Sequence, residues 1–436
     1  MLFRSRWIAY VGHHGGSALN PLTGQKEGNG TTIVDVTDVK QPRIIHHLAT
    51  SSFDENAGGE GGGSQMVQVC AGRDLPKGDR NKFYMTRTDG RRAHELWDVT
   101  VPEKPVKLLN FAENLLSTHR HAWECDTGII YVNSGLPGWE VLRMTQVLDL
   151  SDPLKPVHIR DFALPGQQPG APRRANRRLY DGHGAFSTGV KGNRLYFGYG
   201  NNGNGAFQIV DREKLLKGPK EPTPENLLHP QVAFQHTGTY QAVHAVLPLI
   251  GMEVPQFSRH SKGKVRDFLL VLPEAIENDC HEEPQMLLVV DITDDKHPIG
   301  VANFQVENKD GDFCTRGGRF GPHQTQENLT PVYHKRLIFV AWFNAGVRAV
   351  DMRDPYNPRE VGYYIPATNK HTEPSCAKVA AVSGGARCRI AIVTNNVEVD
   401  DRGYVYMTDR ARSGLHILEP TGAARAIADF SKASKD

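Results

Sequence analysis

One apolar run that ends in an acidic residue recurs seven times along this chain of 436 residues. The copies read TTIVDV, HELWDV, TQVLDL, FQIVD, LLVVDI, VRAVDM and LHILEP, and their acidic residues are Asp35, Asp98, Asp149, Asp211, Asp291, Asp351 and Glu419. Every interval exceeds the roughly 40–50 residues that a four-stranded propeller blade needs. The sequence therefore predicts an all-β fold, a seven-bladed β-propeller with four-stranded blades around a central channel, formed by residues 1–436 as a single domain.

The surroundings of the acid-ending run repeat as well. A turn with proline follows most copies (DVKQP, TVPEKP, SDPLKP, TDDKHP, RDPYNP), and a short apolar strand comes next. Proline fixes the turn dihedral and cannot donate to a strand ladder. We therefore expect the run to be the third strand of each blade, with its aspartate capping the turn. The first blade has only Met1–Ser5 for its innermost strand, and ARAIADF, ending at Phe430, is expected to supply the last outer strand.

Two of these copies, IVDVTDVKQP and LLVVDITDDKHP, resemble the LVIVD-repeat family of β-propellers. The segment GRFGPHQTQEN, followed by FNAGVRAVDMRDPYNPREVGYY, is similar to members of that family as well. The resemblance covers nearly the whole chain and implies the propeller architecture. It implies no particular activity, because propellers carry unrelated functions.

Composition narrows the range of partners and compartments. A net charge of +2 gives no electrostatic footprint for nucleic acid or an acidic membrane surface. No stretch approaches the roughly 20 apolar residues of a membrane span, and the N-terminal segment lacks the apolar core of a signal peptide. Six cysteines occur without a CxxC pair, which favours reduced thiols and a cytoplasmic protein. A bridge between Cys376 and Cys388, or a leader missing upstream of Met1, would change that view.

Histidines occur at the start of the expected first strand in four consecutive blades. The segments HRHAWE, DGHGAF, AVHAVL and GPHQTQ give equivalent positions to His121, His183, His244 and His323. Imidazole ligands suit transition metals, so the sequence predicts one divalent ion, Fe, Mn, Cu or Zn, at the channel mouth. His119 is an alternative to His121. A second alternative is that each repeated histidine only hydrogen-bonds a neighbouring loop carbonyl.

Three glutamates lie near these histidines in the expected topology. Glu124 follows His121 by three residues, Glu327 follows His323 by four, and Glu274 lies in a loop on the same face. A carboxylate that accepts the distal N–H of a ligating histidine fixes its tautomer. Strand alternation favours Glu327, because an even offset keeps two side chains on one side of a strand.

The leading functional hypothesis is a metal-dependent enzyme that acts on a small organic substrate, with oxidoreductase or oxygenase chemistry. The expected site is similar in kind to the four-histidine iron centre of carotenoid cleavage oxygenases and to the histidine-rich face of selenium-binding-protein-type thiol oxidases, although the motifs of neither family occur. One alternative is a metal-assisted hydrolase or lyase with His13, His14 or Asp181 as the base. Another is a non-catalytic propeller that binds a partner protein.

Overall fold

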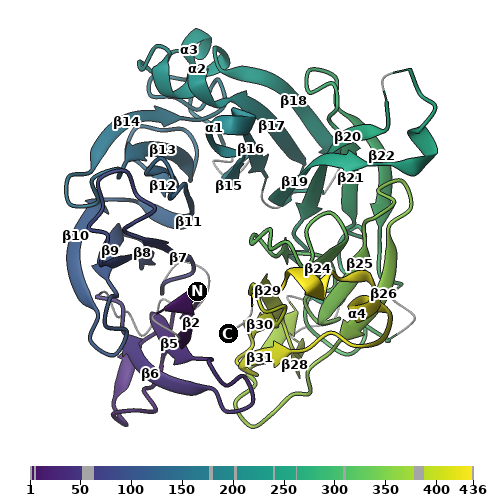
Figure 1. The fold of residues 1–436 in the computed structure, drawn as a ribbon. Coiled ribbons are helices and arrows are strands. Elements are labelled where there is room, and N and C mark those ends of the chain that lie inside the picture. The colour runs from purple at the N-terminus through teal and green to yellow at the C-terminus, as the bar shows by residue number, and fades with distance from the viewer. Residues whose placement is uncertain are drawn as a thin grey trace. The chain divides into compact units, whose positions relative to one another are not determined.

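The computed structural model is predominantly β, and in the part of the chain that it describes seven blade sheets of three or four strands follow one another, besides two two-stranded hairpins (Figure 1). This arrangement confirms the predicted seven-bladed β-propeller. The residues that the structure describes are 2–3, 6–51, 63–175, 180–200, 204–238, 241–261, 263–307, 311–377 and 387–434.

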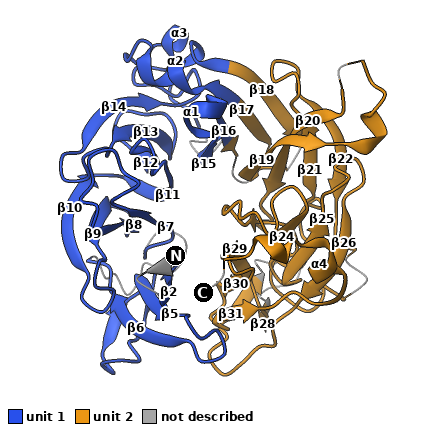
Figure 2. Ribbon diagram, viewed as in Figure 1, with its two compact units in different colours: residues 1–197, 209–231 blue, residues 198–208, 232–436 orange. Residues whose placement is uncertain are grey.

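The chain divides into two compact units, coloured separately in Figure 2. Unit 1 comprises residues 1–197 and 209–231, and unit 2 comprises residues 198–208 and 232–436. That residues 1–436 form a single domain stays a prediction.

Unit 1 contains the first three blades. Their strands are β1 (Leu2–Phe3), β2 (Arg6–Gly12), β5 (Thr31–Asp35) and β6 (Arg43–Leu48); β7 (Val67–Ala71), β8 (Phe83–Asp89), β9 (Ala93–Asp98) and β10 (Val106–Ala112); and β11 (Ser117–Trp123), β12 (Ile129–Gly135), β13 (Met144–Asp149) and β14 (Val157–Phe162). A short hairpin, β3 (Ser17–Leu19) with β4 (Lys26–Gly28), extends from the first blade.

The fourth blade contains residues assigned to both units, and it includes three short helices. It consists of β15 (Gly182–Ser187), α1 (Gly189–Gly192), β16 (Arg194–Tyr199), β17 (Gly205–Asp211), α2 (Arg212–Lys217), α3 (Pro224–Leu228) and β18 (Gln231–Gly238). Asp211 ends the third strand and accepts a hydrogen bond from the backbone N–H of Lys214, which caps α2. The two helices α2 and α3 thus replace the usual proline turn before the outer strand.

Unit 2 contains the remaining blades. Their elements are β19 (Val243–Glu253), η1 (Pro255–Phe257), β20 (Val265–Pro273), β21 (Leu287–Asp291) and β22 (Ile299–Phe304); β23 (Gln324–Thr325), β24 (Leu337–Ala341), β25 (Val347–Asp351) and β26 (Arg359–Tyr364); and, beyond the hairpin β27 (Pro374–Ala377) with β28 (Arg387–Ile390), the strands β29 (Thr394–Val399), β30 (Val405–Asp409) and β31 (Leu415–Leu418), followed by α4 (Gly422–Ile427) and η3 (Phe430–Lys432).

The acid-ending run is the third strand of all seven sheets, as expected. Its aspartates have a structural role. Asp35, Asp98 and Asp291 each accept the backbone N–H two residues further on, at 3.0, 2.9 and 2.8 Å respectively. Such a bond between an aspartate side chain and a nearby N–H stabilises a turn. These aspartates therefore stabilise the turns that follow the third strands and do not belong to a functional site.

The prediction that ARAIADF forms the last outer strand is wrong. Within the described residues the seventh sheet has three strands, and the run that ends near Phe430 forms α4 instead. Alanine and arginine favour helix over strand, and α4 buries Ala424 and Ile427 in an apolar cluster with Val361 of β26. The innermost strand of the first blade is present as β1, paired with β2.

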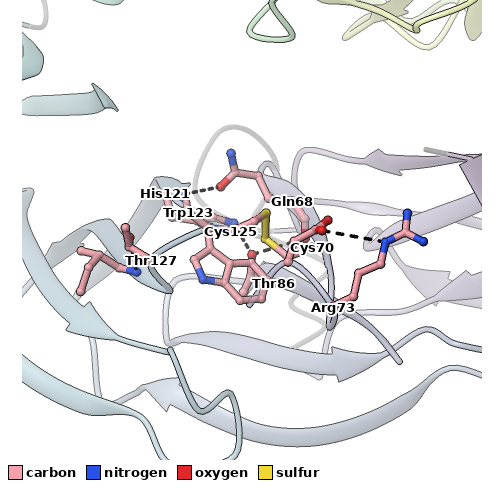
Figure 3. The surroundings of a disulfide bond; sticks show 10 residues. Gln68, Cys70, Arg73, Thr86, His121, Trp123, Cys125 and Thr127 are labelled. Carbon is pink, nitrogen blue, oxygen red and sulfur yellow. Dashed lines mark hydrogen bonds and ion pairs between the residues drawn. A yellow bond between two sulfur atoms is a disulfide. The ribbon is translucent and has the colours of Figure 1, made fainter. Parts of the chain in front are cut away.

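All six cysteines form disulfides, so the expectation of reduced thiols is also wrong. The pairs are Cys70–Cys125, Cys280–Cys314 and Cys376–Cys388; Figure 3 shows the first. Disulfides persist in oxidising environments, so the cytoplasmic location that was inferred from free thiols loses its basis. None of the helices in the described ranges has the length and apolar character that a membrane span requires.

Candidate metal centre

Two histidines and one glutamate of unit 2 gather at the ends of three strands. His244 lies in β19, Glu274 directly follows β20, and His323 directly precedes β23. One donor atom of each residue lies within 4.8 Å of the other two, and the three residues are only 4%, 7% and 5% exposed. All three were among the residues expected at the site, and the structure brings them together.

A β-bulge places the first of these histidines. In the pairing of β19 with β20, Val243 is opposite Pro273 and Ala245 is opposite Leu272, so His244 is an extra residue between them. A bulge redirects a side chain out of the regular alternation of its strand.

Backbone carbonyls determine which ring nitrogen of both imidazoles carries the proton. His244 Nδ1 lies 3.0 Å from the carbonyl oxygen of His323, and His323 Nδ1 lies 2.6 Å from the carbonyl oxygen of Asn395. Because a carbonyl oxygen only accepts, each Nδ1 must carry the proton. In the neutral ring this leaves a lone pair on Nε2, the form in which histidine binds a metal.

The carboxylate lies at a spacing that suits a shared ion. Glu274 Oε1 is 3.8 Å from His323 Nε2, which is too long for a hydrogen bond. Two donors that each lie about 2.1 Å from one ion are at most about 4.2 Å apart. The donor set of two neutral imidazoles and one carboxylate therefore fits a divalent transition metal.

Arg319 also contacts the Glu274 carboxylate. Its Nη1 donates to Glu274 Oε1 at 2.9 Å and to the carbonyl oxygen of Ala275 at 3.3 Å. Its guanidinium lies 5.5 Å from the ring centre of Phe343, whose ring is 5.0 Å from that of His323. Sequence reasoning missed Arg319, although it lies four residues before His323 in the segment quoted for the family resemblance.

The same histidine-to-carbonyl hydrogen bond occurs in unit 1, where it involves His119. His119 Nδ1 lies 3.3 Å from the carbonyl oxygen of His183, and the two rings are 5.2 Å apart. His121 instead lies 2.9 Å, through Nε2, from the hydroxyl of Thr86 (Figure 3), and its ring is 5.6 Å from that of His94. A bulge between Thr118 and His121 explains the difference. In its hydrogen bonding, His119 rather than His121 matches His244 and His323.

Burial favours the neutral form of His119 and His121 in unit 1. It is the largest cause that lowers the pKa of His119 well below its ordinary value, and the charges of Arg143 and Arg120 lower it further. Burial likewise lowers the pKa of His121, aided by His94 and Arg120. The four predicted ligands divide between the units, His121 and His183 in unit 1 and His244 and His323 in unit 2. One ion held by all four stays a prediction.

Glu124 belongs to a separate buried network in unit 1. Its carboxylate receives Arg212 Nε at 2.8 Å and hydrogen bonds from Ser187, Thr127 and Tyr131. Burial alone would raise the pKa of Glu124, but the hydrogen bonds from Arg212, Ser187 and Thr127 outweigh it and lower the pKa. These contacts describe a structural ion pair.

Glu327 lies on a segment that is too irregular for the alternation argument. The strand β23 covers only Gln324–Thr325, so an even offset from His323 does not place Glu327 on the same side. Its Oε1 accepts Gln324 Nε2 at 3.0 Å, and its backbone N–H donates to Glu398 at 3.0 Å. Glu274, and not Glu327, is the glutamate of the three-residue group.

The candidate bases lie in unit 1 and also have partners. Asp181, which is fully buried, pairs with Arg143 Nη2 at 2.7 Å. His13 Nε2 lies 2.8 Å from the hydroxyl of Thr32, and His14 forms an isolated β-bridge with Gly63. A role as base for any of them stays a prediction.

Comparison with known proteins supports the fold alone. No protein-family model matches the chain, and no curated protein matches its sequence. The structure is similar to that of a protein from Lactobacillus plantarum, with 10% identity, 95% of each chain covered and a TM-score of 0.52. It is also similar to a hypothetical selenium-binding protein from Sulfolobus tokodaii, with 13% identity, 94% of this chain and 90% of that chain covered, and a TM-score of 0.53. Membership of the LVIVD-repeat family stays a prediction.

Proposed function

We propose that the protein is a metal-dependent oxidoreductase that binds one divalent transition metal through His244, His323 and Glu274 and acts on a small organic substrate. The observation that carries this proposal is the convergence of three donor atoms, with both Nδ1 protons already directed to backbone carbonyls. A histidine that only stabilised a loop would need no carboxylate within 3.8 Å of its Nε2, as His323 has in Glu274.

Each residue contributes a separate function. His244 and His323 present their Nε2 lone pairs, and Glu274 supplies the single negative charge of the donor set. Arg319 holds the Glu274 carboxylate in one orientation and partly balances its charge. A bound metal with this incomplete set of protein donors would supply open positions for a substrate or for oxygen.

The surroundings favour an organic substrate and a redox reaction. Ala275, Phe343, Val393 and Ala411 form an apolar cluster next to the donors. The Glu274 carboxylate is already held by Arg319, which makes it a poor general base. Two histidines and a carboxylate are the donor set of non-haem iron oxygenases, but also of zinc hydrolases, so the identity of the metal distinguishes the two classes.

Metal analysis of the purified protein tests the proposal. We expect about one equivalent of a redox-active metal and substrate turnover that requires oxygen or another electron acceptor. One equivalent of zinc, with turnover that is independent of any acceptor, would favour the hydrolase or lyase. A stable protein that neither contains nor takes up metal would contradict both enzyme classes and favour the non-catalytic propeller that binds a partner protein.

A further inference from the structure

The segment that begins with Glu274 contains a strained turn. Asp279 and Cys280 are consecutive non-glycine residues, and both have φ near +56°, in the left-handed region. L-residues disfavour this region, and such conformations persist only where surrounding contacts enforce them. Something must therefore hold the turn in place.

Three contacts tie this turn to the segment that carries Arg319. Cys280 forms a disulfide with Cys314. The backbone N–H of Asp279 donates to the carbonyl oxygen of Gly318 at 2.9 Å, and Asn278 forms a β-bridge with Arg319. These three contacts join the turn directly to the segment that contains the arginine bound to Glu274.

Close packing extends the connection to His323. A Cβ atom on Gly321 would lie 2.7 Å from Ala275 Cβ, so the two segments touch directly beside Glu274. Since Arg319, Gly321 and His323 belong to one run of chain, a displacement of the turn would change the distance between the Glu274 carboxylate and His323 Nε2.

We propose that the Cys280–Cys314 disulfide is a redox-sensitive element that positions Glu274, and that its reduction weakens metal binding at this site. The inference rests on the proposed function. Two electrons and two protons convert the S–S bond into two thiols, and the reductant, a dithiol, is oxidised to its own disulfide. Without the cross-link, the turn is free to leave the left-handed region, and Arg319 no longer fixes the carboxylate.

The other two disulfides lie outside the turn that contains Asp279 and Cys280. Cys70–Cys125 belongs to unit 1, and the side chain of Cys70 is 1% exposed. Cys376–Cys388 joins the two strands of the exposed β27–β28 hairpin. Cys280 and Cys314 are both half-buried, so neither is enclosed in the core as Cys70 is.

Co²⁺ titration of paired cysteine variants tests this inference, with visible absorption as the readout. The Cys280→Ser/Cys314→Ser protein should bind Co²⁺ about 10–100-fold more weakly than wild type, the range expected when support of a ligand is lost. The matched control is Cys70→Ser/Cys125→Ser, which removes a disulfide outside the turn and should bind like wild type. Circular dichroism establishes that each variant is folded.

A folded Cys280→Ser/Cys314→Ser protein with wild-type affinity would overturn the inference, as would an equal loss in the control variant. If the first variant does not fold, wild type is reduced with a water-soluble phosphine, which becomes the phosphine oxide as water supplies the oxygen and the two protons. An affinity that falls on reduction and returns on reoxidation, while Cys376→Ser/Cys388→Ser binds like wild type before reduction, supports the inference, and an affinity unchanged by reduction overturns it. If wild type binds no Co²⁺ at all, the proposed function itself fails.

Discussion

His244 donates its Nδ1–H to the carbonyl oxygen of His323 at 3.0 Å, and the two imidazole rings stack with centres 3.9 Å apart. His323 repeats the same bond with Asn395. The hydrogen bond that anchors each ring through Nδ1 therefore goes to the backbone, while the two rings pack against each other. This arrangement orients both Nε2 atoms before any ion binds, and it makes the two histidines separable by mutation.

Replacing either histidine with alanine should abolish stoichiometric metal binding and leave the fold intact. The acceptor of His244 is a main-chain oxygen of residue 323, which remains in His323→Ala. Elemental analysis of the purified variants measures the loss. His297→Ala is the matched control, because that side chain is 80% exposed and pairs with Asp294, three residues before it, at the surface.

The wider four-histidine hypothesis makes an additional prediction. If unit 1 also supplies ligands, His183→Ala should lose metal as His244→Ala does. Full occupancy in His183→Ala, with loss in His244→Ala, would restrict the ligands to unit 2. Full occupancy in both variants would remove the proposed centre.

Glu274→Gln should weaken metal retention by at least about tenfold, because it removes the charge of the donor set. Glu327→Gln should have a much smaller effect, since an amide oxygen can still accept the Gln324 side chain that Glu327 now binds. Competition with a chelator measures both. A larger effect of Glu327→Gln would return the supporting role to Glu327, as strand alternation suggested.

Arg212→Ala should destabilise the protein by about 3–5 kcal/mol, because it leaves the Glu124 carboxylate buried without its cation. Lys217→Ala in the same helix is the control, since its exposed pair with Glu213 contributes about 0.3–0.5 kcal/mol. Urea denaturation measures the free energy of unfolding. A small effect of Arg212→Ala, or a loss of metal from it, would contradict a purely structural role for Glu124.

Glu282 should make stability depend on pH. Burial, the largest cause, raises its pKa to about 7, although the N–H groups of Glu277 and Ile276 and the charge of Arg319 act in the opposite direction, and the Glu277 carboxylate adds to the rise. A raised folded-state pKa gives a stabilising contribution that is fully present below the ordinary value near 4.5 and is lost as pH rises through about 7.

Thermal or urea unfolding between pH 5 and pH 8 follows this loss, over the window that the raised pKa defines. Glu282→Gln keeps an oxygen acceptor for the two backbone N–H groups and cannot ionise, so its stability should vary less over the same range. An identical pH dependence in wild type and variant would show that Glu282 does not titrate there.

The fold was predictable because its signal is local and repeated. Each third strand carries its own apolar run and terminal acid, and Asp98 needs only Thr100 to form its turn. The prediction of the last outer strand was wrong because it relied on the repeat and not on local preference. The residues ARAI favour a helix, and they lie in α4.

The site was predictable in part. His244, His323 and Glu274 were identified from repeat position, but the bulge that separates His119 from His121 leaves no mark in the sequence. The partner of Glu124 is Arg212, 88 residues away, and the Cys280–Cys314 pair spans 34 residues. Contacts between loops at such separations follow from three-dimensional packing, not from spacing.

Anomalous X-ray diffraction from crystals of the purified protein, recorded at the absorption edge of the metal that elemental analysis identifies, tests the central claim most directly. We predict one strong peak about 2.0–2.2 Å from Nε2 of His244, Nε2 of His323 and a carboxylate oxygen of Glu274. The absence of a peak from metal-supplemented crystals, or a peak bound only elsewhere, would contradict the proposed centre.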